Sequence, residues 1–140
     1  MKKDNRPNRV FCIVGDGECQ EGQIWEAAAF AAQQNLTRLT LFIDHNKEQL
    51  DGNVCDICNL APLDKKFAAF GWNVLQVDGH NVDEVSQAIS SAKLFEEKPT
   101  AVILHTIKGK GCSFAEGKLN HHVTVSEKEA EQAIAALMAQ

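Results

Sequence analysis

The sequence predicts an α/β fold, a mostly parallel sheet with flanking helices. Short β-rich runs alternate with segments of helical periodicity, an order typical of parallel strands joined by right-handed crossovers. Two of the runs are continuously apolar, which suits strands covered on both faces. The 140 residues, 44% hydrophobic and 24% charged, have the size and balance of one domain with one core.

The four predicted strands are identified by their apolar, β-branched composition. The first ends in Val-Phe-Cys-Ile-Val and the second begins with Leu-Thr-Leu-Phe-Ile, and neither run alternates with charged residues. The predicted strands are 9–14, 39–44, 73–77 and 100–106.

Apolar residues at helical spacing fill the gaps between these strands. The first predicted helix, 22–34, is rich in Ala. Its apolar face is formed by Ile24, Ala28, Ala31 and Ala32. The second, 62–70, begins at Pro62 and stops before Gly71, the asymmetry expected of helix ends.

Two further helices carry N-terminal signals. Asn81 is the predicted N-cap of a helix at 82–95. The apolar face of that helix is formed by Val82, Val85, Ala88, Ile89 and Ala92. Ser126 and Glu129 make a capping box at the start of a final helix. The apolar face of the final helix is formed by Ala130, Ile134 and Leu137.

Two long segments, 47–60 and 109–123, are rich in Gly, Asn, Cys and charge, and we expect them to be loops. Each follows a strand, so both lie at the carboxyl edge of the sheet, where ligands of such folds bind. Long loops at that edge are candidates for function.

Charge and hydropathy disfavour two classes of function. Lys and Arg number 14 against 19 Asp and Glu, and the net charge of −5 without a basic stripe disfavours nucleic-acid binding. No apolar run is long enough to span a membrane, and residues 1–7 lack the apolar core of a secretory signal. We therefore expect a cytoplasmic protein.

The five cysteines, without a secretory context, are expected to be reduced thiols. Cys55 and Cys58 have the CxxC spacing of redox sites and of half a zinc site. No second such pair accompanies them, which favours two ordinary thiols on a loop.

The sharpest local feature is Gly15-Asp16-Gly17, directly after the first strand. Glycines on both sides let the chain turn and let backbone amides approach a ligand. Asp16 places a carboxylate at the carboxyl end of the strand, where it is a good Mg²⁺ ligand. A tight turn without a ligand is the alternative interpretation.

Asn46, after the second strand, strengthens the case for a metal site. Residues 18 to 45, 28 in all, separate it from Gly17, and one crossover helix fills that gap. Asp16 and Asn46 are therefore expected at the same sheet edge, on neighbouring strands. One charged and one neutral oxygen suit Mg²⁺ that carries a diphosphate, because a second carboxylate would repel the phosphate oxygens. Alternatively, Asn46 only ends the strand.

The pattern of Gly-Asp-Gly followed by Asn after about 28 residues resembles the thiamine-diphosphate-binding signature. The surrounding sequence is similar to transketolases. The resemblance covers nearly the whole chain from about residue 9 and is closest to the amino-terminal section of split, two-subunit transketolases. It is carried by 15–27 (GDGECQEGQIWEA), 44–52 (DHNKEQLDG), 70–72 (FGW), 77–80 (VDGH) and 106–111 (TIKGKG). Deoxyxylulose-phosphate synthase and acetyl-transferring 2-oxo-acid dehydrogenases share the bare signature but usually lack these surroundings.

The resemblance implies roles for the residues of this signature. Asp16 and Asn46 would bind Mg²⁺ through their side chains, and Glu48 would bind it through its backbone carbonyl. Gly15 and Gly17 would lie against the diphosphate of the cofactor, with the Gly17 amide as donor.

Two acidic residues and two histidines complete the predicted site. Glu21 matches a glutamate at the family's subunit interface, and Glu26 a second acidic residue of that network; a solvated or helix-capping role is the alternative. His121 or His122 would contact substrate and cofactor, although the Gly-x-Pro that usually follows this histidine is missing. Two exposed loop histidines are the alternative.

The resemblance also implies what acts together with this chain. Residues 1–140 would be part of one thiamine-diphosphate-binding domain, which in the family extends upstream, so the chain is expected to be an excised fragment or a partial gene product. Catalysis would need a carboxyl-terminal, pyrimidine-binding section in a homo- or hetero-oligomer, so this polypeptide alone is expected to be inactive. The substrates would be sugar phosphates, as in the pentose phosphate pathway.

Two other functions remain open at this point. Another thiamine-diphosphate enzyme, such as deoxyxylulose-phosphate synthase, would share the cofactor site. A non-catalytic nucleotide-binding or interaction module is the second alternative. It is disfavoured because Gln20 stands at the third glycine position of the dinucleotide-binding fingerprint.

Overall fold

The computed structural model describes residues 6–118, 121–122 and 124–139. Its strands are β1 (Val10–Gly15), β2 (Leu39–His45), β3 (Glu48–Gln49), β4 (Gly52–Asn53), β5 (Asn73–Asp78) and β6 (Thr100–His105). Its helices are α1 (Gly22–Gln33), α2 (Val54–Cys58), α3 (Leu63–Ala69), α4 (Val82–Leu94) and α5 (Glu127–Met138), with a short 3-10 turn, η1, at Glu18–Gln20.

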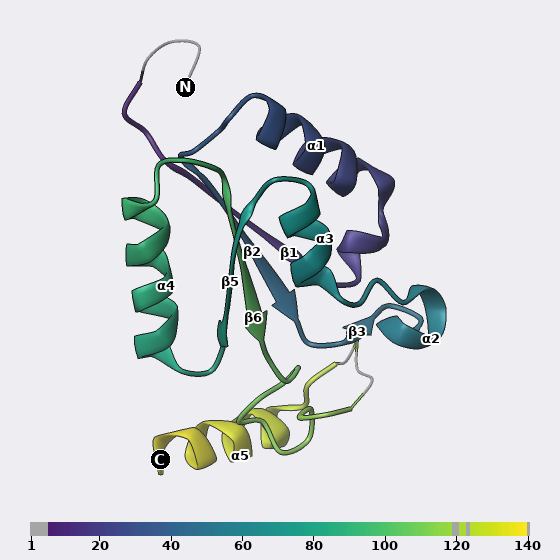
Figure 1. Ribbon diagram of the computed structural model, residues 1–140. Helices are drawn as coiled ribbons and strands as arrows, with labels where there is room; N and C mark the ends of the chain where they lie inside the picture. The colour runs from purple at the N-terminus through teal and green to yellow at the C-terminus, as the bar shows by residue number, and fades with distance from the viewer. Residues whose placement is uncertain (1–5, 119–120, 123, 140) are drawn as a thin grey trace.

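Four of the strands form one parallel sheet in the order β1-β2-β6-β5 (Figure 1). Because all four run in the same direction, their carboxyl ends meet at one edge. At that edge Gly15 of β1 lies opposite Asp44 of β2, and His45 of β2 lies opposite His105 of β6. The short antiparallel pair β3-β4 follows β2 at the same edge.

Helices cover both faces of the sheet: α1 and α3 on one, α4 on the other (Figure 1). The larger core lies under α1 and α3, where the buried Trp72 indole packs against Phe67 and donates from Nε1 to the Ala28 carbonyl at 2.9 Å. The smaller core joins Phe42 and Val102 to α4. This framework fixes the strand ends that carry the candidate site.

The predicted α/β fold and its four strands are confirmed, and the strand ends differ from the predicted ones by at most one residue. The expectation that the first strand is covered on both faces is wrong. β1 is an edge strand, and Ile13 is 72% exposed. Phe11 stacks on Phe42, so Phe11 and Ile13 lie on the face of the sheet that α4 covers. Because α4 packs against β5 and β6, it leaves this face of β1 exposed.

The predicted helix starts are also confirmed. The Asn81 side chain accepts from the amides of Asp83 and Glu84, and Ser126 forms the expected reciprocal capping box. Three expected apolar positions are wrong. Val82, the first residue of α4, is 81% exposed, and on α5 Ile134 is 58% exposed and Leu137 51%.

α5 lies beyond the end of the sheet (Figure 1) and packs on the segment that follows β6, where Leu137 comes close to Gly111. None of its side chains is buried.

The segment 47–60, which was expected to be a loop, contains β3, β4 and α2. Such short elements leave too little periodicity to detect. No helix in the described part of the chain is long and apolar enough to cross a membrane.

Candidate functional site

The Asp16 carboxylate is buried at the carboxyl end of β1. The residue is 1% exposed, and Oδ2 accepts from the Lys47 amide at 2.9 Å. Oδ1 has no hydrogen-bond partner among the described residues. Burial raises the pKa of this carboxyl, opposed by the hydrogen bond from Lys47 and by His45. A buried carboxylate oxygen without a partner is costly, and a bound cation would satisfy it.

The turn after Asp16 leaves no room for a side chain at Gly17. A Cβ placed on Gly17 would lie 2.5 Å from Cβ of Gln49, so glycine is needed for the close approach of this turn to β3. The Gly15 amide donates to the Glu18 carboxylate at 2.6 Å. The turn therefore presents backbone atoms beside Asp16.

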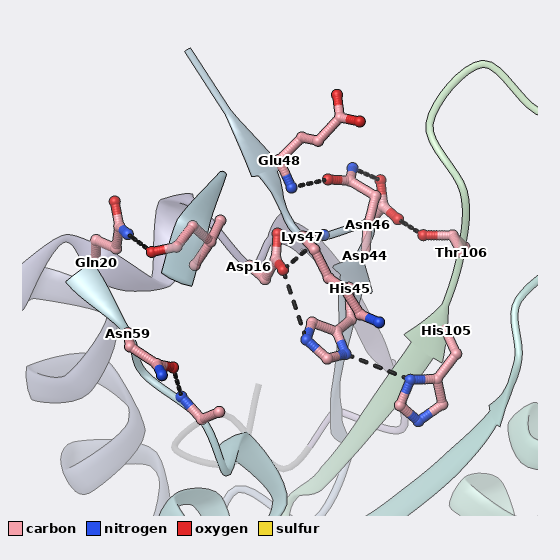
Figure 2. Close-up of polar contacts among 12 residues, drawn as sticks. Asp16, Gln20, Asp44, His45, Asn46, Lys47, Glu48, Asn59, His105 and Thr106 are labelled. Atoms are coloured by element: carbon pink, nitrogen blue, oxygen red, sulfur yellow. Dashed lines mark hydrogen bonds and ion pairs between the residues drawn. The ribbon is translucent and has the colours of Figure 1, made fainter. Parts of the chain in front are cut away.

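Asn46 lies next to Asp16 because β1 and β2 are neighbouring parallel strands, as the sequence predicted. The Asn46 amide nitrogen Nδ2 donates to Asp44 Oδ2 at 2.9 Å, and its oxygen Oδ1 accepts from the Glu48 amide at 2.9 Å. The Asp44 carboxylate also accepts from the Thr106 hydroxyl. Figure 2 shows these side chains gathered where β2 and β6 end.

The chain between Asn46 and Glu48 has an unusual backbone. Lys47 has a φ of 67°, in the left-handed region that non-glycine residues rarely adopt. In this conformation the Lys47 amide reaches Asp16, and the next amide, that of Glu48, reaches Asn46. Backbone strain of this kind is concentrated at functional sites.

Two imidazole side chains lie beside this cluster. Nε2 of His45 lies 3.7 Å from Asp16 Oδ2, and its Nδ1 lies 3.3 Å from Nδ1 of His105. Nε2 of His105 in turn contacts Gln76 Oε1 at 3.0 Å, so these side-chain contacts run from β2 across β6 to β5. Burial lowers the pKa of His45, which favours the neutral ring.

The predicted histidines lie on the segment that follows β6. His121 and His122 are exposed, and Nδ1 of His121 lies 3.0 Å from Nζ of Lys108. Among the contacts of the described residues, none joins either histidine to Asp16 or Asn46. Their predicted contact with substrate stays a prediction.

Glu21, directly before α1, and Glu26, within it, are exposed. Glu21 occupies the N-cap position, but its side chain makes no capping hydrogen bond. This disfavours the helix-capping alternative, while the predicted interface role stays a prediction. Glu48 lies in β3, and its side-chain Oε2 is buried without a hydrogen-bond partner within the described residues.

The two cysteines of the CxxC pair lie on the short helix α2, not on a loop. Both are exposed, and Cys55 donates from Sγ to Asp56 at 3.5 Å, which raises the pKa of its thiol. Redox-active cysteines have lowered pKa values, so this geometry favours an ordinary thiol. Within the described residues, no group of three His, Cys, Asp or Glu side chains is placed to hold a metal ion.

Sequence reasoning missed the residues that hold the site together. Asp44 lies two positions before Asn46, close enough for a local contact to be anticipated. Thr106 reaches Asp44 only because β6 lies beside β2, and nothing in the sequence specified that strand order.

Residues 2–138 match the family model described as "Transketolase, thiamine diphosphate binding domain". This chain belongs to that family. Among its relatives, a 6-deoxy-6-sulfo-D-fructose transketolase subunit of Clostridium sp. strain MSTE9 is 48% identical over 98% of this chain and 50% of that protein. An apulose-4-phosphate transketolase subunit from Actinobacillus succinogenes is 40% identical, over 97% of this chain and 49% of that protein.

The fold agrees with solved transketolase structures. The transketolase of Campylobacter jejuni superposes with a TM-score of 0.84 and 28% identity, over 95% of this chain and 21% of that chain. The chain thus spans half or less of the length of these relatives. The family and its thiamine-diphosphate-binding domain are therefore established for this chain.

Proposed function

We propose that this chain is the Mg²⁺- and diphosphate-binding part of a transketolase. The complete enzyme would transfer a two-carbon ketol group from a ketose phosphate to an aldose phosphate. The observation that carries the proposal is the buried Oδ1 of Asp16, which has no hydrogen-bond partner in the part of the chain that the structure describes and lies at the strand end next to Asn46.

The oxygen atoms at this edge fit Mg²⁺. The cation prefers hard oxygen ligands and usually binds through one or two carboxylates plus substrate phosphates. Asp16 offers an unpaired carboxylate oxygen, and the Asn46 amide oxygen keeps a lone pair after accepting from Glu48. A backbone carbonyl from Glu48 would add a further ligand. Because Asn46 is neutral, it would not repel the phosphate oxygens.

The turn at Gly15 and Gly17 is suited to a diphosphate group. The absence of room at Gly17 keeps side chains away, so the group would lie against backbone, with the Gly17 amide as donor. When bound, thiamine diphosphate supplies the carbanion chemistry of the reaction. The chain's own residues would hold the cation and the diphosphate in place.

Other residues of the chain would act at the edges of this site. His121 or His122 would donate a hydrogen bond to a sugar hydroxyl, and the nearby Lys108 would add positive charge for a sugar phosphate. Glu21, exposed at the start of α1, would face a neighbouring subunit. The partner would be a carboxyl-terminal, pyrimidine-binding section. Alone, the chain is expected to show no ketol transfer.

The donor sugar is open within this proposal. One relative is named for a 6-sulfo-fructose and another for apulose-4-phosphate, so related subunits serve different sugars. Assays of the assembled enzyme with fructose 6-phosphate, its 6-sulfo counterpart and apulose 4-phosphate would rank the donors. Synthesis of deoxyxylulose phosphate instead of ketol transfer would support the alternative enzyme.

Calorimetric titration tests the cofactor site itself. Thiamine diphosphate is titrated with and without Mg²⁺ into the chain mixed with a pyrimidine-binding section, and Asp16→Ala is titrated in parallel. Saturable binding that requires both Mg²⁺ and Asp16 is expected. Binding of ADP or NAD in preference to thiamine diphosphate, or binding unaffected by Asp16→Ala, would overturn the proposal.

A further inference from the structure

The orientation of the Asn46 side chain decides whether it can bind a cation. The two ends of an asparagine amide have nearly the same shape but opposite chemistry, since the oxygen accepts and the NH₂ group donates. Only the oxygen is a ligand for Mg²⁺. A half-turn of the amide would direct two N–H groups at the cation.

The neighbours of Asn46 fix this orientation. The Glu48 backbone N–H can only donate, so the atom that faces it at 2.9 Å must be oxygen. A carboxylate can only accept, so the atom that faces Asp44 Oδ2 at 2.9 Å must be nitrogen. A reversed amide would place N–H against N–H and oxygen against carboxylate. Figure 2 shows Asn46 held between these two partners.

Asp44 is itself held in place. Its second carboxylate oxygen accepts from the Thr106 hydroxyl, on the chain that follows β6. Its backbone lies in β2, an inner strand paired with both β1 and β6. The Asp44 carbonyl also accepts from the Asp16 amide at 3.0 Å. Asp44 therefore contacts both residues whose side chains would bind the cation.

We propose that Asp44, supported by Thr106, is a positioning residue that turns the oxygen of Asn46 toward the cation. This inference rests on the proposed function. Asp44 is not one of the metal ligands in this proposal: its two oxygens accept hydrogen bonds from Asn46 and from Thr106. Loss of such a supporting partner typically weakens metal binding by about 10- to 100-fold.

Two substitutions at position 44 separate orientation from charge. Asp44→Leu removes both acceptors, whereas Asp44→Asn keeps an oxygen for Asn46 and places an NH₂ group where the Thr106 hydroxyl oxygen can accept. If orientation matters, the Leu variant binds metal about 10- to 100-fold more weakly, and the Asn variant stays within about three-fold of the wild type. If Asp44 acts only through its negative charge, both variants weaken equally, which would overturn the proposal.

A second pair of variants covers the case in which Asp44→Leu does not fold. Thr106→Val removes the hydroxyl, and we expect a loss of about five-fold in metal affinity, as for one hydrogen bond. Thr106→Ser restores the hydroxyl and should restore affinity. Asp78→Leu is the matched control: Asp78 ends β5 at the same sheet edge, and its carboxylate accepts from the His80 amide. That variant should bind metal like the wild type.

Mn²⁺ serves as the probe. Its free signal is followed by electron paramagnetic resonance as protein is added, with thiamine diphosphate and the pyrimidine-binding section present, and Mg²⁺ is then used to displace it. No Mn²⁺ binding, or equal binding by Asp16→Ala, would overturn the proposed function and this inference with it. Binding that Asp16→Ala abolishes but Asp44→Leu and Thr106→Val leave unchanged would overturn the inference alone.

Discussion

Replacing Asp16 by Asn should stabilise the ligand-free chain while weakening its cation site. The side chain is 1% exposed, and none of the described residues gives Oδ1 a hydrogen bond. An unpaired buried polar atom costs about 1–3 kcal/mol, and a buried charge costs more. The raised pKa of this carboxyl has the same cause, since burial disfavours the charged form. Asn keeps an acceptor for the Lys47 amide and removes the charge.

The size of the gain in the free energy of unfolding follows from these two costs. Removal of the buried charge raises the free energy of unfolding, but the new amide NH₂ would still be buried without a partner and offsets part of that gain. We therefore expect a net increase of about 1–2 kcal/mol in the free energy of unfolding. For 140 residues the unfolding entropy is about 0.29 kcal/mol/K, so the melting temperature should rise by about 3–7 °C. With Mg²⁺ and thiamine diphosphate at about 100 times their Kd, the wild type should gain about 2.7 kcal/mol, or about 9 °C.

Thermal unfolding followed by circular dichroism measures the melting temperatures of the wild type and the Asn variant, with and without both ligands. The Asn variant should melt higher without ligand and lower with it. Asp78→Asn, at an exposed carboxylate that accepts from the His80 amide, is the control and should show no gain. A ligand-free Asn variant that melts below the wild type would refute the argument from burial. If both ligands raised the melting temperatures of the two proteins equally, the cation site would be refuted.

Three further predictions follow from local geometry. Gly17→Ala should lower the free energy of unfolding by about 1–3 kcal/mol because the new Cβ would lie 2.5 Å from Cβ of Gln49. Gly22→Ala, with nothing within 4 Å, is the matched control, and equal melting temperatures for the two would contradict the packing argument. The buried Cys19 thiol, whose pKa burial raises to about 12, should resist iodoacetamide at pH 8 while exposed cysteines react, as mass spectrometry of the native chain would show. Asn81→Ala should cost about 1 kcal/mol in thermal unfolding by removing the α4 cap, and an unchanged melting temperature would argue that the cap contributes nothing.

Local sequence signals predicted most of this fold. The apolar runs identified the strands, and the helix ends were marked by Asn81 and the Ser126 capping box. The adjacency of Asp16 and Asn46 followed from a single crossover between consecutive strands. These features depend on short stretches of chain, which a sequence displays directly.

The features that the sequence did not predict depend on contacts between distant segments. The link from Thr106 to Asp44 and the approach of His105 to His45 both require β6 to lie beside β2. The exposure of Ile13 depends on which strands α4 covers. Apolar composition alone does not tell which side of an edge strand is covered.

The most direct test of the account is to locate the bound cation. The chain is labelled with ¹⁵N and mixed with the unlabelled pyrimidine-binding section and thiamine diphosphate, and Mn²⁺ is added in place of Mg²⁺. Amide signals of Gly17, Lys47 and Glu48 should broaden first, while that of Ala88, in the α4 core, should stay sharp. Broadening centred on another part of the chain, or none at a saturating metal concentration, would contradict the assignment of this strand edge as the cofactor site.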